Sequence, residues 1–275
     1  MIAARSVFES FKVVEKMLPD IDEPFTGIQI FGSDVEYMVK AAFFIQHRGK
    51  FIDINAGCPV KKVIKKGAGG ALVRDLPKLL EMVREVKKNT EIPISVKTRI
   101  GWDKDEADKI YYSLVDAGAD FVVIHTRTVK QVFLGKADWK VLRKIKEKPI
   151  PLYISGDIFT PEDAKTALEV SDADGVVVAR GAIGNPWIFT QIMDYIDTGR
   201  YKKPSPKERL ELFLKHIEEN VKFFGEPKGI VEMRKFIAGY TKSIPLARRL
   251  RERFMKVQTL KEVRQLFEEF TNAFT

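Results

Sequence analysis

The sequence predicts an α/β fold with a parallel sheet, followed by a small all-helical region. Short apolar runs rich in Val and Ile alternate with amphipathic helical stretches, and the runs cover residues 25–31, 51–57, 92–98, 121–127, 150–156 and 174–180. Repeated strand-then-helix units favour a parallel sheet built from βα units. The runs are almost unbroken, which is typical of strands that are covered on both faces.

The helix expected before the last run carries its own start signals. Thr160 can act as the N-cap, and Pro161 suits the first helical position, where its missing N–H would have had no partner. Glu162 and Asp163 then place negative charge near the positive end of the helix dipole. The sequence therefore predicts that this helix begins at residue 160 or 161.

A domain boundary is expected near residue 200, separating a barrel at residues 1–200 from a helical domain at residues 201–275. Beyond Pro204 only helical periodicity follows, with breaks near Gly225 and Pro245. The tail carries 17 Lys and Arg against 10 Asp and Glu, a net charge of +7, whereas the rest of the chain carries +2. A basic tail favours a polyanionic partner, although a solvated helical surface explains the charge equally well.

Composition restricts the compartment. Cys58 is the only cysteine, so the chain cannot form an internal disulfide. No secretory leader opens the sequence, and no apolar run approaches the ~18 residues of a membrane span. A reducing cytoplasm is therefore expected, with no membrane and no metal.

Polar residues and glycines lie at or just after the carboxyl end of each predicted strand. They are Gln29, Asn55, Cys58, Lys97, Arg99, His125, Arg127, Gly156, Asp157, Arg180 and Gly181. TIM (β/α)8-type barrels build their sites at that end, so the pattern predicts one shared site. Each residue alone has an ordinary explanation, because strands end at solvent and a lone cysteine is more often a small buried hydrophobe.

The last run continues into ARGAIGNPWIF, residues 179–189, a stretch that suggests phosphate binding. Backbone N–H groups of a Gly-containing turn before a helix attract an anion, and Arg180 can add two parallel hydrogen bonds. A loop after the seventh or eighth strand is where such barrels commonly bind phosphate. Gly181 and Gly184 alone are weak evidence, because glycines also simply form turns.

Five motifs occur in the order DINAGCPVKKVIKKGAGGAL, VKTRIGW, IHTRT, SGDI and ARGAIGNPWIF. Together they resemble the tRNA-dihydrouridine synthase family, whose members are FMN-dependent barrel enzymes that reduce uridine in tRNA. The resemblance covers nearly the whole chain, including the C-terminal helices. It implies an oxidoreductase with bound FMN, NADPH or NADH as reductant, and tRNA as substrate and partner.

The resemblance also implies roles for the strand-end residues. It places the catalytic acid on Cys58, a substrate-contacting amide on Asn55, flavin contacts on Gln29, Lys97 and His125, phosphate contacts on Gly156, Asp157, Arg180 and Gly181, and further substrate contacts near the flavin and target base on Arg99 and Arg127. Hydride from reduced flavin would go to C6 of uracil, and C5 then needs a proton. A thiol of ordinary acidity is mostly protonated at neutral pH, as a general acid must be.

The resemblance extends to how the RNA would be held. A uracil inside folded tRNA must leave its stack to reach the flavin. The basic tail would bind the RNA backbone, with its densest cluster at Arg248, Arg249, Arg251 and Arg253. Without the family, a solvated helix face explains that cluster equally well.

The sequence departs from the family at its start, MIAARS, which resembles the end of the family's second strand. The family begins with a strand and a helix whose Pro-Met-x-Gly loop covers part of the flavin. The pattern here gives six strands and one stub, whereas closure needs eight. We therefore expect an N-terminally incomplete barrel, either because the start was misassigned and roughly 35 to 40 residues precede it or because the barrel is truncated.

Two alternatives from other classes remain. A different FMN barrel that acts on a small molecule would explain the strand-end residues but not the basic tail. A non-catalytic or truncated RNA-binding relative would explain the charge and the incomplete barrel. The sequence does not define the modified tRNA position, the choice between NADPH and NADH, or the oligomeric state.

Overall fold

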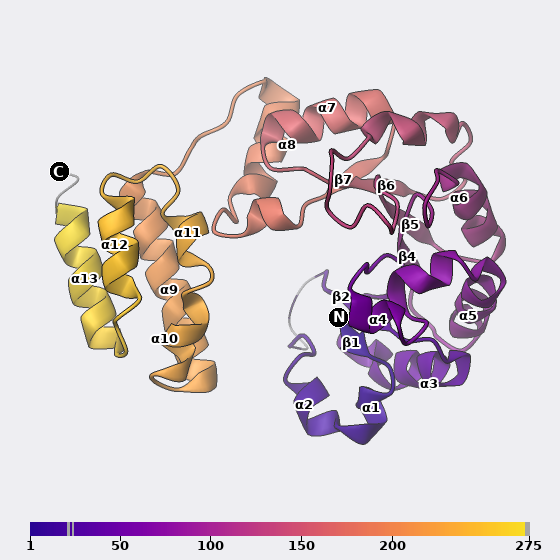
Figure 1. Ribbon diagram of the computed structural model, residues 1–275, viewed down its shortest axis with the longest axis horizontal. Helices are drawn as coiled ribbons and strands as arrows, with labels where there is room; N and C mark the ends of the chain where they lie inside the picture. The colour runs from indigo at the N-terminus through magenta and orange to yellow at the C-terminus, as the bar shows by residue number, and fades with distance from the viewer. Residues whose placement is uncertain (21–22, 24, 273–275) are drawn as a thin grey trace. The chain divides into compact units, whose positions relative to one another are not determined.

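The computed structural model describes residues 1–20, 23 and 25–272, which pack as two units (Figure 1). The first unit comprises residues 1–158 and 166–178, and the second comprises residues 159–165 and 179–275. The two units part after Val178, whereas the sequence places a domain boundary near residue 200. That boundary stays a prediction, because packing alone does not show which segment folds independently.

Among the described residues of the first unit, seven parallel strands form one sheet in chain order. They are β1 (Ile2–Ala3), β2 (Gly27–Phe31), β3 (Phe51–Asn55), β4 (Ile94–Arg99), β5 (Phe121–His125), β6 (Leu152–Ser155) and β7 (Gly175–Val177). Each of the six predicted runs overlaps one of β2 to β7, with β4 extending one residue beyond its run, and the stub at MIAARS supplies β1. The predicted α/β, TIM-barrel-like class is confirmed, with seven paired strands where a closed barrel of this type has eight.

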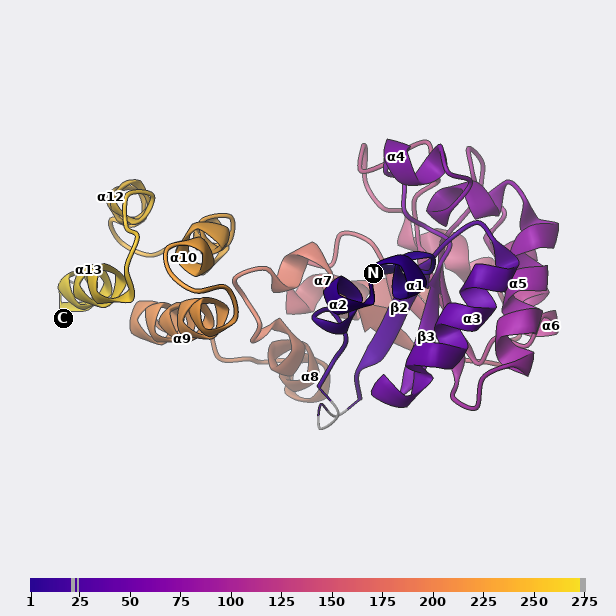
Figure 2. The same ribbon diagram turned by 90° about the horizontal axis from the view of Figure 1, so that it is seen from below.

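Helices cover one face of this sheet. The first unit contains α1 (Ser6–Glu9), α2 (Phe11–Glu15), α3 (Val35–Ile45), α4 (Lys61–Ile64), α5 (Leu76–Lys88), α6 (Ala107–Asp116) and the 3₁₀ helices η1 (Gln46–Arg48), η2 (Gly69–Val73) and η3 (Trp139–Lys144). Figure 2 shows α3, α5 and α6 side by side along the sheet. The next helix, α7 (Pro161–Ser171), begins where predicted, since the Asp163 N–H donates to Thr160 Oγ1 at 3.1 Å.

The two faces of the sheet carry different chemistry, because successive strand side chains point to opposite sides. One face is aliphatic and at most 3% exposed at Ile28, Ile30, Ile52, Ile54, Ile94, Val96, Val122, Ile124, Leu152 and Ile154. The register aligns the polar residues on the opposite face, in the pairs Gln29 with Asp53, Asn55 with Lys97, Arg99 with His125 and His125 with Ser155. The aliphatic face therefore packs against the helices, and the opposite face carries the polar side chains.

Aromatic rings fill the polar face near the strand starts. The ring centroid of Phe121 lies 5.1 Å from that of Phe51 and 5.7 Å from that of Tyr153. Gly27 and Gly175 make room for these rings, because a Cβ would lie 2.1 Å from the Phe51 ring or 2.7 Å from the Tyr153 ring. The space for a ligand on this face is therefore left to the carboxyl ends of the strands.

The second unit is helical after the short turn η4 (Arg180–Ala182). It contains α8 (Ile188–Thr198), α9 (Pro206–Phe224), α10 (Lys228–Met233), α11 (Ile237–Tyr240), α12 (Ala247–Phe254) and α13 (Leu260–Asn272). The predicted breaks are confirmed, with α9 ending before Gly225 and α12 beginning after Pro245. Its core centres on Phe213, which stacks on Tyr240 and Phe267 at centroid distances of 4.6 and 5.6 Å. Among the described residues, no helix combines the length and apolarity that crossing a bilayer requires.

Candidate active site at the strand ends

Asn55 fixes the turn that carries the lone thiol. Its side-chain oxygen accepts hydrogen bonds from the backbone N–H groups of Gly57 at 3.2 Å and Cys58 at 2.9 Å. Its side-chain N–H donates to Gln29 Oε1 at 2.9 Å. The last residue of β3 thus connects the thiol turn to β2, and the Cys58 side chain is partly exposed there.

Small residues let the chain close around Cys58. The Gly70 N–H donates to the Cys58 carbonyl at 2.9 Å, so the segment that leaves the site at Cys58 returns to it twelve residues later. A Cβ at Gly70 would lie 2.8 Å from the Val129 side chain, and one at Gly69, where φ is +60°, would lie 3.0 Å from Cys58 Cβ. The glycines of the GAGG stretch are therefore required by this close approach.

Asp53 supports the site from below, and the sequence prediction missed it. Its carboxylate accepts hydrogen bonds from Gln29 Nε2 at 2.5 Å and Ser95 Oγ at 2.7 Å. Burial raises the pKa of Asp53, and the two hydrogen bonds partly oppose that rise. A carboxylate in the middle of the apolar run at residues 51–57 was the available signal, because a buried charge in a strand needs partners.

Lys97 brings a positive charge next to Asn55, its register partner on β3. Burial lowers the pKa of Lys97, the nearby Asp53 opposes this, and the charge of Arg99 adds to it. No hydrogen bond or ion pair engages its ammonium group among residues 1–20, 23 and 25–272. A half-buried cation without a partner favours a ligand that carries negative charge at this point.

His125 is neutral at physiological pH. Burial, followed by the positive charges of Arg99, Lys97 and Arg127, lowers the pKa of His125 to about 3. A Cβ at Gly156, where φ is +118°, would lie 2.6 Å from the ring Cδ2 of His125. The glycine therefore allows the β6 turn to pass against a neutral imidazole that can donate or accept one hydrogen bond at each nitrogen.

Two buried arginines hold the loop at residues 128–137. Arg99 is 2% exposed and donates to the backbone carbonyls of Gly57, Thr128 and Val132 at 3.0, 2.8 and 2.7 Å. Burial, with the nearby charge of Arg127, lowers the pKa of Arg99 to about 10, which keeps it charged at neutral pH. Its Nε and Nη1 donors thus fix the thiol turn and the loop, and its predicted contact with substrate stays a prediction.

Arg127 is also 2% exposed and forms a bidentate pair with Asp157, with N–O distances of 3.0 and 2.5 Å. It further donates to the carbonyls of Leu134 at 3.2 Å and Gly135 at 2.7 Å. Asp157 adopts a φ of +54° and accepts a third hydrogen bond from the Ala137 N–H at 2.9 Å. Both residues shape the rim of the site, and their predicted roles toward substrate and phosphate stay predictions.

The structure gathers nine of the eleven predicted site residues in the first unit, whereas Arg180 and Gly181 belong to the second. There the Arg180 guanidinium lies 5.3 Å from the centroid of the Phe159 ring. Arg180 and Gly181 line a pocket of about 440 Å³ together with Tyr201, Lys203 and Lys242. Their predicted contribution to phosphate binding stays a prediction.

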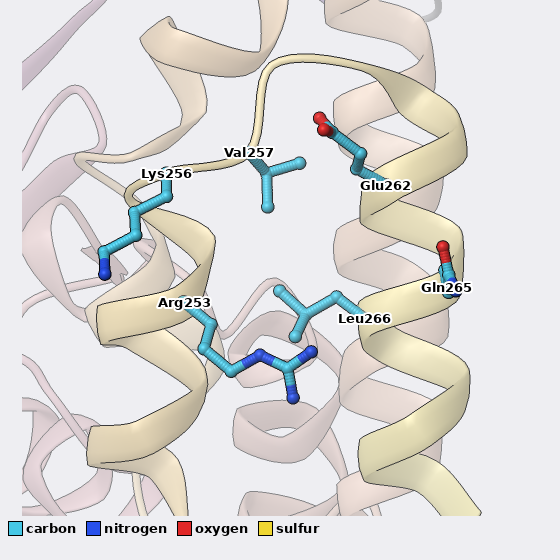
Figure 3. Close-up of a pocket in the computed structure, with 6 residues that line it drawn as sticks. All are labelled: Arg253, Lys256, Val257, Glu262, Gln265 and Leu266. Atoms are coloured by element: carbon cyan, nitrogen blue, oxygen red, sulfur yellow. The ribbon is translucent and has the colours of Figure 1, made fainter.

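Another pocket of the second unit, of about 280 Å³, has mixed charge. Arg253, Lys256 and Val257 line one side, and Glu262, Gln265 and Leu266 of α13 line the other (Figure 3). Arg253 is already paired with Glu269 at 2.5 Å. In the part of the chain that the structure describes, no group of three His, Cys, Asp or Glu residues is placed to hold a metal ion.

Comparisons with known proteins agree on one family. The sequence model of the family described as Dihydrouridine synthase (Dus) matches residues 1–275. The chain is similar to "Probable tRNA-dihydrouridine synthase 1" of Synechocystis sp., with 33% identity over 274 residues, 98% of this chain and 77% of that protein. It is also similar to tRNA-dihydrouridine synthase B of Pseudomonas aeruginosa, with 34% identity over 260 residues, 91% of this chain and 78% of that protein.

A solved structure, that of morphinone reductase in complex with tetrahydroNAD, matches with a TM-score of 0.42 and 16% identity, over 63% of this chain and 51% of that chain. A likeness of that size does not establish a shared fold.

Proposed function

The chain belongs to the dihydrouridine synthase family, and we propose that it reduces uridine in tRNA to 5,6-dihydrouridine with FMN as cofactor and NADPH or NADH as reductant. The observation that carries this proposal is the position of Cys58, a partly exposed thiol on a turn held by Asn55, one strand away from Lys97, whose ammonium has no partner among the described residues. This arrangement sets a proton donor beside a site that favours negative charge.

The residues on the polar face fit a reduced flavin. Reduced FMN, when bound, supplies the hydride that C6 of uracil accepts. Lys97 is suited to hold the anionic ring, because its ammonium has no partner in the described residues and would gain one. The second N–H of the Gln29 amide, whose first donates to Asp53, and the neutral His125 would offer hydrogen bonds to ring heteroatoms, and Gly156 leaves room beside the imidazole.

Cys58 would complete the reaction as general acid. Its Sγ–H bond breaks and the proton goes to C5 of uracil, which balances the hydride added at C6. Asn55 fixes the backbone of the thiol turn with one hydrogen-bond acceptor. Its amide, held by Gln29, lies at the same strand end, where the resemblance expects a contact with the substrate.

Replacement of the thiol tests this proposal. We expect Cys58→Ala to retain bound FMN but to lose about 10²- to 10⁴-fold in the single-turnover rate of tRNA reduction, the usual contribution of general acid catalysis. The rate is measured as dihydrouridine formed per enzyme with prereduced protein, and flavin content by absorbance. Val60→Ala, an exposed residue two positions further on, is the matched control and should keep the rate. An unchanged rate in Cys58→Ala would remove the thiol from the mechanism.

A further inference from the structure

Four lysines follow the turn that carries Cys58, and the chemistry above does not use them. They are Lys61, Lys62, Lys65 and Lys66, all exposed, and no carboxylate occurs between residues 58 and 74. None of the four ammonium groups makes a hydrogen bond or ion pair within the described ranges, whereas nearby acids are engaged. Asp103 pairs with Lys130 at 3.0 Å, and Asp75 caps the start of α5.

Chain connectivity keeps these lysines close to the thiol. Lys61 and Lys62 are three and four residues from Cys58, so their Cα atoms lie within roughly 11 and 14 Å of its Cα. Lys66 is held from the other side, because the Gly70 N–H donates to the Cys58 carbonyl. Figure 2 shows α4 beyond the ends of β2 and β3, so this lysine segment, residues 61–66, borders the site.

An apolar loop tip borders the site on another side. Phe133 is 52% exposed and Leu134 is 76% exposed, although the loop beneath them is fixed by the buried guanidinium groups of Arg99 and Arg127. The Arg99 guanidinium lies 5.5 Å from the centroid of the Phe133 ring. A loop held by two buried cations presents its aromatic residue in a defined position, as a binding platform requires.

Arg99 connects the two borders directly. It donates to the Gly57 carbonyl in the thiol turn and to the Thr128 carbonyl at the start of the loop. Exposed cations beside an exposed aromatic ring are the features that bind a single-stranded nucleic acid, since the cations contact phosphates and the ring stacks on a base. An acidic protein surface would use the lysines but not the ring.

We propose that the lysine segment and the tip at Phe133 form an RNA-docking surface around Cys58, which binds the single-stranded tRNA segment on both sides of the reacting nucleotide. This inference rests on the proposed function. The first unit then contributes its own electrostatic contacts to the RNA, next to the reacting base, in addition to those expected from the basic tail.

The salt dependence of tRNA binding tests the lysines. With the full chain, Lys61→Gln, Lys62→Gln, Lys65→Gln and Lys66→Gln are combined in one variant. We expect the slope of log K against log salt to become shallower by about 2 to 3, at roughly 0.7 per phosphate contact, and affinity near 0.15 M salt to fall by about tenfold or more.

A variant with the same charge change is the control. Lys50→Gln, Arg84→Gln, Lys88→Gln and Lys146→Gln remove four exposed cations that lie on α5 or shortly before β3, β4 and β6. This control should keep the wild-type slope. A lysine-segment variant with the wild-type slope, or a control with the same loss, would overturn the proposal.

Phe133→Ala tests the stacking contact separately. It should weaken tRNA binding by about 5- to 150-fold, the range measured for base–aromatic stacking, without changing the salt slope. Phe133→Tyr should bind normally, and Phe43→Ala, which removes a 63% exposed aromatic residue of α3, is the matched control. Equal affinity of Phe133→Ala and wild type would show that the surface binds an anion but no base.

These measurements follow binding of tRNA and not formation of dihydrouridine. A chain that binds tRNA through the lysine segment but leaves uridine unreduced would contradict the proposed function and support the docking surface. If the chain reduces uridine and the lysine-segment variant keeps the wild-type salt slope, the proposed function would be supported and the docking surface contradicted.

Discussion

The strand-end site and the helical second unit both use many cations, but they hold them differently. In the site, Arg99 and Arg127 are 2% exposed and donate to backbone carbonyls and to Asp157. In the helical unit, Arg248 pairs with Glu252 at 2.9 Å while its side chain is 90% exposed. The same residue type therefore fixes a loop in one region and forms a screened surface pair in the other.

The comparison shows that net charge along the sequence is a poor guide to where charge acts. The tail at residues 201–275 carries +7, yet several of its cations are paired with carboxylates three or four residues away. The first 200 residues carry only +2, yet burial, followed by the nearby charges of Arg99, Lys97 and Arg127, lowers the pKa of His125 to about 3. Electrostatic interactions grow as water is excluded, so a few buried cations outweigh many exposed ones.

The largest difference is expected when each region loses one carboxylate. Asp157→Asn should lower the free energy of unfolding by about 3 kcal/mol, because it leaves the buried Arg127 without its counter-charge. Glu252→Gln should change it by less than about 0.5 kcal/mol, because the pair with Arg248 is exposed. Urea unfolding of both variants measures the difference, and equal losses would show that the buried pair is no more important than the surface one.

Glycines at positive φ provide the next comparison. Gly156→Ala should destabilise the protein by about 2 kcal/mol more than Gly199→Ala, since its Cβ would also enter the His125 ring, an overpacking cost added to backbone strain. Gly199 has a φ of +71°, and a Cβ added there would meet no atom within 4 Å. Thermal unfolding measures both, and a Gly156→Ala variant that matches Gly199→Ala would mean that the imidazole moves away at no cost.

The histidines differ in what surrounds them. Burial lowers the pKa of both His125 and His216. The positive charges of Arg99, Lys97 and Arg127 lower the pKa of His125 further, and Asp157 opposes them. In the unfolded chain His125 binds a proton below about pH 6.5, whereas in the folded protein it does so only near pH 3. The contribution of His125 to the free energy of unfolding is therefore complete above about pH 6.5 and falls as the pH is lowered.

Substitution of each histidine checks that sign. As the pH falls from about 6.5 toward 3, the free energy of unfolding of wild type should decrease by up to about 1.4 kcal/mol per pH unit more than that of His125→Gln. Unfolding free energies at pH 7, 6 and 5 provide the test, and His216→Gln should differ from wild type over a narrower range. If the stability of His125→Gln fell with pH as steeply as that of wild type, neither burial nor the nearby cations would lower the pKa of His125 in the folded protein.

The smallest effect is expected from the arginine cluster of α12. Arg248 and Arg253 are paired with Glu252 and Glu269, and Arg251 donates to Thr241 Oγ1 at 3.3 Å. Changing these three residues and Arg249 to Gln should make the salt slope of tRNA binding shallower by only about one phosphate contact, roughly 0.7. A loss equal to that of the lysine-segment variant would show that the ion pairs open freely for RNA.

Much of the fold could be predicted from periodicity alone. The six apolar runs locate β2 to β7, and the start signal at Thr160 places α7 correctly, because strand burial and helix capping depend on residues that are consecutive in the chain. The shared end of a parallel sheet also brought Asn55, Lys97 and His125 together without any knowledge of distances. The family was identified from the same strand-end motifs.

The support of the site could not be read in the same way. The resemblance implies that Arg99 and Arg127 contact the substrate, and only the structure shows that Arg99 also donates to carbonyls 29 to 42 residues away and Arg127 to Asp157. The sequence also does not indicate that Asp53 accepts hydrogen bonds from Gln29 and Ser95. Hydrogen-bond partners far apart in the chain leave no local pattern.

By itself, then, the sequence determined the order of strands and helices, the end of the sheet that carries the chemistry, and the lone thiol beside Asn55. Only the tertiary structure decided which cations are buried, which are paired and which remain available, because burial depends on what packs against a side chain from elsewhere in the chain. That is why two basic segments with four cations each, residues 61–66 and 248–253, look equivalent in sequence and differ in the folded protein.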